Sequence, residues 1–201
     1  MNESKDAAQE IILNGGLKRR LVHELWEIVK VLLIAAAVVL PVRYFIAQPF
    51  IVRGASMEPN FENSEYLIID EVSYYAREPV RGEAIVFRYP ANPKQFFIKR
   101  VVGLPGEEVE IRDGRVVIKN GQYPGGFVLD EAYLDPPKRP TEPPLAMRLR
   151  DGEYFVMGDN RDASSDSRIW GPLKQDLIVG RAFWRVWPFR RMGFIPDFSL
   201  R

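Results

Sequence analysis

Residues 84–102 read AIVFRYPANPKQFFIKRVV. The stretch holds two apolar runs, Ala84 to Tyr89 and Gln95 to Val102, with turn-forming residues between them. Both runs are rich in β-branched and aromatic side chains, which is typical of strands. On a strand, Lys99 shares its face with Phe97 and Val101, because alternate side chains point the same way. The stretch therefore predicts two strands, the second with a lysine among apolar neighbours.

The same pattern of short apolar runs separated by turn signals continues along the chain beyond Phe50. Further strands are predicted at Tyr66 to Asp70, Glu108 to Arg112, Arg115 to Lys119, Glu153 to Gly158, Leu177 to Gly180 and Ala182 to Trp187. Asp113-Gly114 separates two alternating runs, which is a strong hairpin signal. No long helical period follows residue 50. The fold class predicted for residues 48–201 is mainly β and largely antiparallel.

An excursion from about residue 106 to 150 is expected to form a small inserted β lobe. It contains the predicted hairpin and a proline-rich segment, Asp135 to Pro144. Closely spaced prolines favour extended chain over helix or strand.

Composition excludes several classes of site. The chain has 201 residues, a formal net charge of +1, no cysteine and one histidine, His23. Disulfides, thiolate zinc sites and multi-histidine metal sites are therefore excluded. The charge balance gives no sign of nucleic-acid binding, which usually needs a strongly basic patch. We expect no cofactor and no metal.

Residues 25–47 are predicted to be a transmembrane anchor helix. The run from Val31 to Val42 has no charge, and its extension from Ile28 to Ile46 approaches the roughly 20 residues that span a bilayer. Basic residues are enriched on the N-terminal side: Lys18, Arg19, Arg20 and Lys30. The positive-inside bias therefore leaves residues 1–24 in the cytoplasm and exports the domain at 48–201, in a single pass of the cytoplasmic membrane.

Two other interpretations of this segment remain open. A buried soluble helix has the same composition. A cleaved signal peptide would need small residues after the apolar run, whereas Pro41, Arg43, Tyr44 and Phe45 follow it. This argues for an uncleaved anchor.

Ser56 lies in a turn-like segment, Gly54-Ala55-Ser56-Met57-Glu58-Pro59. A serine hydroxyl needs a base to become a nucleophile, and with His23 far away near the N-terminus, Lys99 is the candidate. A lysine acts as a base only when neutral, so its pKa must fall by about 3 units from roughly 10.4. Burial on an apolar strand face lowers a lysine pKa. A loop serine and a solvent-facing edge-strand lysine are the plain alternatives.

A third segment, residues 158–171, reads GDNRDASSDSRIWG and is dense in hydroxyls, carboxylates and guanidiniums. A solvated loop with Asx-type turns is its plain interpretation. A calcium loop is excluded, because an EF-hand counted from Asp159 would have Arg161 and Ala163 at ligand positions.

Together with Gly82-Glu83-Ala84-Ile85-Val86-Phe87 and Val101-Val102-Gly103-Leu104-Pro105-Gly106-Glu107, the three segments resemble the bacterial type I signal peptidases. The resemblance runs from about Gln48 to Gly180. It implies a membrane-anchored serine endopeptidase that removes signal peptides from exported preproteins. The expected partners are the exported preproteins and the lipid bilayer, and we also expect an association with the secretion machinery.

By position, the resemblance implies that Ser56 is the nucleophile and Lys99 the general base. It implies that the Ser164 hydroxyl hydrogen-bonds the lysine amine, and that four polar residues hold the site together: Asp159, Arg161, Asp166 and Arg168. We expect an Asp166–Arg168 or related ion pair. Some members carry an oxyanion-binding serine where this chain has Gly54. The oxyanion must then rely on the Ser56 N–H plus another donor, such as a Gly54 backbone group or water.

The resemblance also implies cleavage after small residues, in an Ala-X-Ala pattern, by an extended substrate that pairs with an exposed strand. The candidate walls of two shallow pockets are Ile51, Met57, Ile85, Phe87 and Ile98, each of which is equally an ordinary core residue. A membrane-facing surface is predicted from Phe183, Trp184, Trp187, Phe189 and Phe194 with Arg190 and Arg191. Trp184 and Trp187 have opposite parity, so a regular strand would point them to opposite sides.

Two rival functions share these features. A self-cleaving repressor-type protease uses the same Ser–Lys core but carries a DNA-binding helical domain in place of an anchor. A non-catalytic anchored β domain would bind exported chains without cutting them, and an activity assay separates it from an enzyme.

Overall fold

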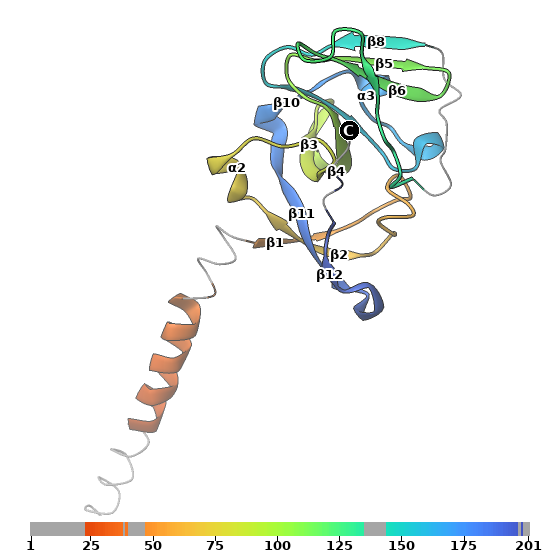
Figure 1. Cartoon of the computed structure of the whole chain (residues 1–201). Helices are drawn as coiled ribbons and strands as arrows, with labels where there is room; N and C mark the ends of the chain where they lie inside the picture. Colours follow the sequence, from red (N-terminus) through yellow and green to blue (C-terminus); the bar gives the residue numbers. More distant parts are fainter. Residues whose placement is uncertain (1–22, 38, 40–46, 135–143, 197, 199–201) are drawn as a thin grey trace, which may run out of the picture. The chain divides into compact units, whose positions relative to one another are not determined.

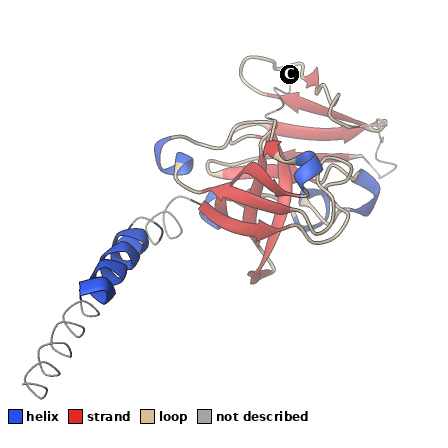
Figure 2. Cartoon of the chain, turned by 90° about the horizontal axis from the view of Figure 1, so that it is seen from below, coloured by secondary structure: helices blue, strands red, loops and turns tan. Residues whose placement is uncertain are grey.

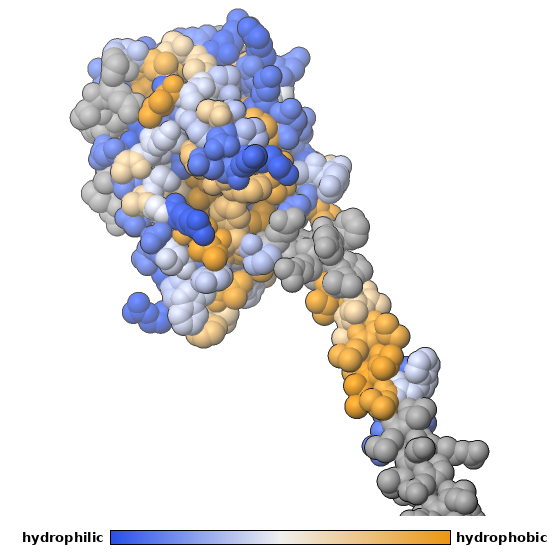
Figure 3. All heavy atoms as spheres, turned by 180° about the vertical axis from the view of Figure 1, so that it is seen from behind, coloured by the Kyte–Doolittle hydropathy of each residue, from blue (hydrophilic) through white to orange (hydrophobic). Residues whose placement is uncertain are grey.

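The computed structural model describes residues 23–37, 39, 47–134, 144–196 and 198. The chain divides into two units, Met1–Phe45 and Ile46–Arg201. In the first unit, residues 23–37 and 39 are helical, and apolar side chains such as Leu32 and Ile34 cover the helix surface (Figure 3). Among the described residues, none of the helices combines the length and the apolar character that a membrane crossing needs. Most of the predicted cytoplasmic segment, and residues 38 and 40–46 of the predicted anchor, lie outside the described residues.

The second unit contains two antiparallel sheets (Figures 1 and 2). The larger has eight strands in the order β1-β2-β11-β3-β4-β9-β10, with β12 paired to β11. Their bounds are β1 Ala47–Ile51, β2 Tyr66–Asp70, β3 Ala84–Tyr89, β4 Asn92–Gly103, β9 Glu153–Met157, β10 Leu173–Lys174, β11 Ile178–Trp187 and β12 Gly193–Phe194. The mainly antiparallel β fold predicted from sequence is confirmed for the described residues.

The smaller sheet has the order β7-β6-β5-β8 and lies within the range expected for the inserted lobe. Its strands are β5 Glu108–Arg112, β6 Arg115–Lys119, β7 Phe127–Val128 and β8 Leu145–Arg148. The Asp113-Gly114 turn joins β5 to β6, with both residues at positive φ. Residues 135–143 of the proline-rich segment lie outside the described residues.

Helices in the described part of this unit are short. They are α2 Ser73–Ala76, α3 Ser167–Trp170, and the 3₁₀ turns η2 Arg161–Ala163, η3 Gln175–Leu177 and η4 Phe189–Arg191. This agrees with the absence of a long helical period after residue 50.

Several strand boundaries differ from the sequence prediction, each for a local reason. β1 was not predicted, because Pro49 has no N–H to donate; β1 ends the sheet, where a proline is tolerated. β11 is one strand rather than two, and register shifts with β2 and β3 let it continue through Gly180. One shift falls between Arg185 and Trp187, so Trp184 lies opposite Ile68 and Trp187 opposite Tyr66, on one face of β2 rather than on two. Trp184 is half-buried and Trp187 exposed.

Candidate active site

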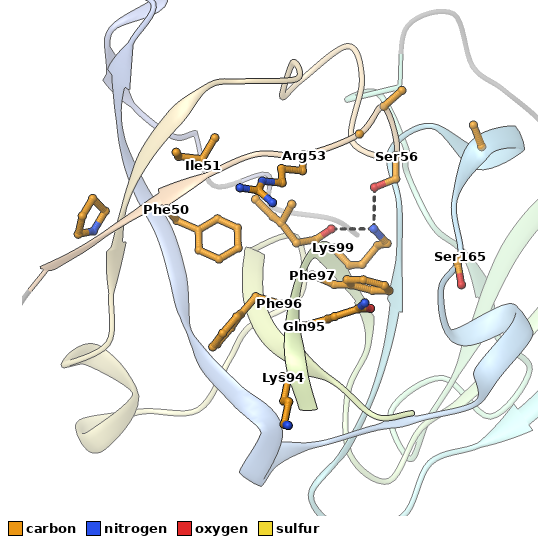
Figure 4. A pocket seen from close by; sticks show the side chains of 15 residues that line it. Phe50, Ile51, Arg53, Ser56, Lys94, Gln95, Phe96, Phe97, Lys99 and Ser165 are labelled. Atoms are coloured by element: carbon orange, nitrogen blue, oxygen red, sulfur yellow. Dashed lines mark hydrogen bonds between the residues drawn. The ribbon is translucent and has the colours of Figure 1, made fainter. Parts of the chain in front are cut away.

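Ser56 and Lys99 meet where the turn after β1 approaches β4 of the larger sheet. Lys99 lies on β4, and Ser56 follows β1 in a turn that Gly54 begins at a φ of +87°. The Lys99 Nζ is 2.7 Å from Ser56 Oγ and 2.9 Å from the Ile98 carbonyl oxygen, to which it donates (Figure 4). Both distances are within hydrogen-bond range. The structure thus brings together two residues that are 43 positions apart in the sequence.

The lysine is almost fully withdrawn from water, with 4% of its surface exposed. Burial lowers the pKa of Lys99 to about 8, while the carboxylates of Asp166 and Asp159 act in the opposite direction. Removing water disfavours the ammonium form, which is the physical cause of the shift. A lysine with such a pKa is partly neutral near neutral pH and can accept a proton from a hydroxyl.

Asn160 holds the Ser56 turn from the other side. Its backbone N–H donates to the Ser56 carbonyl at 3.0 Å, and its Nδ2 donates to the Ala55 carbonyl at 3.1 Å. Gly158 allows this approach, because a Cβ there would lie 2.4 Å from the Ser56 carbonyl oxygen and 2.2 Å from Ser164 Oγ. Asn160 was not singled out from the sequence, although it belongs to the polar segment that was.

The remainder of the polar segment folds around Asp166. Its carboxylate pairs with Arg168 Nε at 2.8 Å and accepts a hydrogen bond from the Gly158 N–H at 2.9 Å. Arg168 also donates to the Arg161 carbonyl at 2.8 Å. The expected Asp166–Arg168 ion pair is present. It fixes the loop that carries Asn160 against the end of β9.

A second buried ion pair, not anticipated from the sequence, joins this loop to the strand of Lys99. Arg100 Nε and Nη2 lie 2.8 and 2.6 Å from the two carboxylate oxygens of Asp159. The Arg100 guanidinium is flanked by the rings of Tyr133 and Phe198, with centroids 4.6 and 4.8 Å away. The available signal was strand alternation, which points Arg100 to the face opposite Lys99.

Arg161 points away from the dyad toward the lobe side. It pairs with Glu131 and donates to the Tyr133 hydroxyl at 2.8 Å. Arg161 therefore supports the loop from behind and does not contact Ser56 or Lys99 in the described residues.

A groove of about 760 Å³ opens beside the dyad. One wall comes from the chain before Ser56 and the other from the first half of β4 (Figure 4). Its lining is Pro49, Phe50, Ile51, Arg53, Gly54, Ala55, Ser56, Lys94, Gln95, Phe96, Phe97, Ile98, Lys99, Ala163 and Ser165. In the described residues β4 pairs with β9 only from Arg100 to Gly103, so its earlier half presents an unpaired edge. An extended peptide could pair with such an edge.

The signal peptidase family model, peptidase S26, matches residues 25–187 of the chain. The chain belongs to this family. It is 37% identical over 85% of its length to a probable signal peptidase I-2 of Synechocystis, covering 77% of that protein. Identity is also 37% to a signal peptidase I of Leptolyngbya laminosa, over 84% of this chain and 83% of that protein.

A crystal structure of a signal peptidase I from Enterococcus faecalis is 33% identical, covers 52% of this chain and 97% of that chain, and gives a TM-score of 0.44. The family assignment confirms the predicted class, a serine endopeptidase that cleaves signal peptides. It favours the signal peptidase over the repressor-type protease.

Ser164 departs from what the resemblance to signal peptidases implies. Its hydroxyl is buried and has no hydrogen-bond partner among the described residues. The described hydrogen bonds of Lys99 Nζ go to Ser56 and to the Ile98 carbonyl instead. The expected contact between Ser164 and the lysine amine is therefore absent, and the hydroxyl packs against Gly158.

The Gly54 backbone is not available as an oxyanion donor in this signal peptidase. Its N–H donates to Asn63 Oδ1 at 2.9 Å. The Ser56 N–H, by contrast, donates to no described residue. A side chain at Gly54 would meet no atom within 4 Å, but the positive φ there strains any L residue.

The predicted pocket walls divide into two groups. Ile51 and Ile98 line the groove. Met57, Ile85 and Phe87 do not: each is at most 1% exposed and packs within the hydrophobic core. Phe50 and Phe96, whose rings contact each other edge to face at 6.1 Å, take their place in the lining.

Proposed function

We propose that this signal peptidase cleaves exported preproteins after small residues, with Ser56 as nucleophile and Lys99 as general base. The observation that carries the proposal is the 2.7 Å contact between the two side chains in a buried setting. A neutral amine at hydrogen-bond distance from a hydroxyl is the arrangement that activates a serine without histidine.

The proposed reaction has two halves. Ser56 Oγ attacks the scissile carbonyl carbon while its proton moves to Lys99 Nζ, which then protonates the departing amine. A water, deprotonated by Lys99, attacks the resulting ester; Lys99 then returns the proton to Ser56 Oγ as the C–O bond breaks and the acyl product leaves as a carboxylic acid. The Ser56 N–H is the proposed backbone donor to the oxyanion, consistent with its lack of an acceptor in the described residues.

The groove is the proposed binding site for the residues before the scissile bond. Its apolar lining, with Ile51, Phe96 and Ile98, suits small apolar side chains such as those of an Ala-X-Ala segment. The unpaired half of β4 supplies backbone groups for an extended substrate. Asp159, Arg161, Asp166 and Arg168 act as structural support, together with Arg100 and Asn160.

We further propose that residues 25–46 anchor the enzyme in the cytoplasmic membrane, with residues 1–24 inside and the β domain outside; Ala47, the last residue of the predicted anchor, belongs to β1. The exposed apolar side chains of the described helix support this, as do exposed aromatic residues of the β domain, Phe183, Trp187, Phe189 and Phe194. Association with the secretion machinery is an extension of this proposal. Extraction of membranes with alkaline carbonate, followed by protease protection in spheroplasts, tests the anchor and its orientation.

The catalytic assignment is tested by cleavage of a preprotein with an Ala-X-Ala site by the detergent-solubilised protein. Ser56→Ala and Lys99→Ala should each lower cleavage by roughly 10⁴-fold or more. His23→Ala is the control and should cut normally. Substantial cutting by Ser56→Ala would reject the mechanism.

A pH profile tests the role of Lys99 independently. The amine must be neutral, and its pKa is about 8, so kcat/KM should fall about tenfold per pH unit well below 8 and level off above it. A profile that is flat between pH 6 and pH 9 would contradict a lysine base.

A further inference from the structure

Two cationic side chains line the groove beside the dyad without an acidic partner. Arg53 stands on the wall that precedes Ser56, and Lys94 on β4. Neither forms an ion pair with a described residue, and the lining contains no aspartate or glutamate. Most other arginines near the site are neutralised, as Arg100 is by Asp159. The groove is therefore a region of uncompensated positive charge.

The two cations lie at different depths along the groove. Arg53 and Ile51 line it while Val52, between them, is buried, as expected for an extended segment. Arg53 is three residues before Ser56 and stands next to the turn that Gly54 begins, so it lies on the groove wall close to the nucleophile. Lys94 is five residues before Lys99, roughly 16 Å along β4. Figure 4 shows Lys94 at the end of its wall that is away from Ser56.

We propose that this groove selects substrates with acidic side chains before the scissile bond. Arg53 favours an acid two or four residues before the bond, and Lys94 one five or six residues before it. The proposal rests on the proposed function, since it specifies the substrate for that site.

The assignment of positions follows from strand geometry. An extended substrate advances about 3.3 Å per residue, so the spacing of Lys94 from Lys99 along β4 corresponds to about five residues from the scissile carbonyl, whereas Arg53, beside the Ser56 turn, faces residues nearer the bond. Residues one and three before the bond enter the apolar pockets, which leaves the alternate side chains free to meet Arg53. Carboxylates that reach an unpaired guanidinium or ammonium form charge-assisted hydrogen bonds.

A set of synthetic peptides tests the inference on the full-length protein. The parent has alanine one and three residues before the bond, and Asp, Asn or Lys is placed either two or five residues before it. With the wild type, kcat/KM should follow the order Asp, Asn, Lys at both positions, each step about threefold at low ionic strength. The preference should shrink in about 0.5 M NaCl, because salt screens exposed charges.

Variants assign each preference to one residue. Arg53→Gln should bring the Asp-to-Asn ratio at the near position to about one and leave the far ratio unchanged. Lys94→Gln should do the reverse, and Arg53→Glu should invert the near preference. Arg115→Gln, an equal charge change at an exposed position of the smaller sheet, is the matched control and should change neither ratio.

The outcomes separate this inference from the function on which it rests. If the Asn peptides are cut but Asp and Lys peptides react equally, the charge selection is overturned while the peptidase assignment holds. If no peptide is cut, the proposed function itself fails. Equal peptide ratios together with weaker binding of both glutamine variants to vesicles of anionic phospholipid would assign the two cations to lipid headgroups and overturn the proposal.

Discussion

Lys99 on β4 and Lys119 on β6 both lie next to apolar residues of their strands, yet their pKa values shift in opposite directions. On β4, Lys99 is 4% exposed and burial lowers its pKa to about 8. On β6, Lys119 is at the surface, where a hydrogen bond to Glu110 raises its pKa. The reactivity of a strand lysine is thus set by what covers it.

The difference extends to the neighbours of each lysine. The buried residues of β5 and β6 are all apolar: Val109, Ile111, Val116, Val117 and Ile118. Around β4, Lys99, Arg100, Asp159 and Asp166 are buried, and each forms a hydrogen bond with another side chain or with the backbone. Buried charge is costly unless it is paired, so the site region depends on its buried ion pairs and the buried part of the smaller sheet does not.

The largest expected effect comes from breaking the buried Arg100–Asp159 pair. Asp159→Asn leaves the guanidinium buried without its charge partner, which should cost about 3–5 kcal/mol of unfolding free energy. Chemical denaturation followed by tryptophan fluorescence measures it. The double variant Arg100→Met/Asp159→Leu should recover part of the loss. A loss below about 1 kcal/mol for Asp159→Asn would show that the pair is not effectively buried.

Removal of the buried amine should stabilise the protein at neutral pH. The pKa of Lys99 is about 8 in the folded state against an ordinary value of 10.5, so the unfolded state binds more protons in that window and stability rises with pH across it. Lys99→Met removes the cost of burying this titratable amine, and should add at most roughly 3 kcal/mol to the free energy of unfolding below pH 8. The gain should vanish near pH 10.5. Denaturation series at pH 7 and pH 10 check it, and equal gains at the two values would refute the burial of the charge.

Gly158→Ala should lower activity more than stability. The new methyl would meet the Ser56 carbonyl oxygen and Ser164 Oγ at 2.4 and 2.2 Å, which must displace the Ser56 turn. A displacement of about 1 Å near reacting groups can cost on the order of 10²-fold in rate. Gly121→Ala is the matched control in the lobe, where a Cβ meets nothing within 4 Å, and its kcat/KM should be that of the wild type.

The smallest effect is expected at the other lysine of the comparison. Lys119→Met removes a part-buried ion pair with Glu110 at the surface of the smaller sheet, and ion pairs that water still reaches contribute little. Neither the denaturation midpoint at pH 7 nor its pH dependence between 7 and 10 should change measurably. A pH-dependent gain like that of Lys99→Met would remove the contrast between the two strands.

Local sequence patterns predicted several strands and the segments that form the candidate site. Short apolar runs bounded by turn residues placed β2, β3, β5 and β6 within their observed bounds: β2 and β5 alternate between core and surface, whereas β3 and β6 are buried over consecutive residues. The serine turn, the lysine strand and the polar segment were also recognised, since each has an unusual composition. β1 escaped detection because Pro49 and the preceding apolar run mask an edge strand.

Most of the wrong sequence predictions concern contacts between segments that are far apart in the chain. Met57, Ile85 and Phe87 were assigned to pocket walls but lie in the core, whereas Phe50 and Phe96 line the groove. Alternation divides a strand into two faces, but it does not say which face another element will cover. Because alternation does not show which element covers a strand face, the Arg100–Asp159 pair and the hydrogen bonds from Asn160 to the Ser56 turn were not predicted.

The sequence by itself determined the fold class, the family and the identity of the candidate dyad, because residue types and their spacing carry those signals. Only the tertiary structure decided that Lys99 is buried, that its amine meets Ser56 rather than Ser164, and that Arg53 and Lys94 share one groove. Burial and proximity arise when segments more than 40 residues apart pack together. A pKa depends on that packing and cannot be obtained from neighbouring residues along the chain.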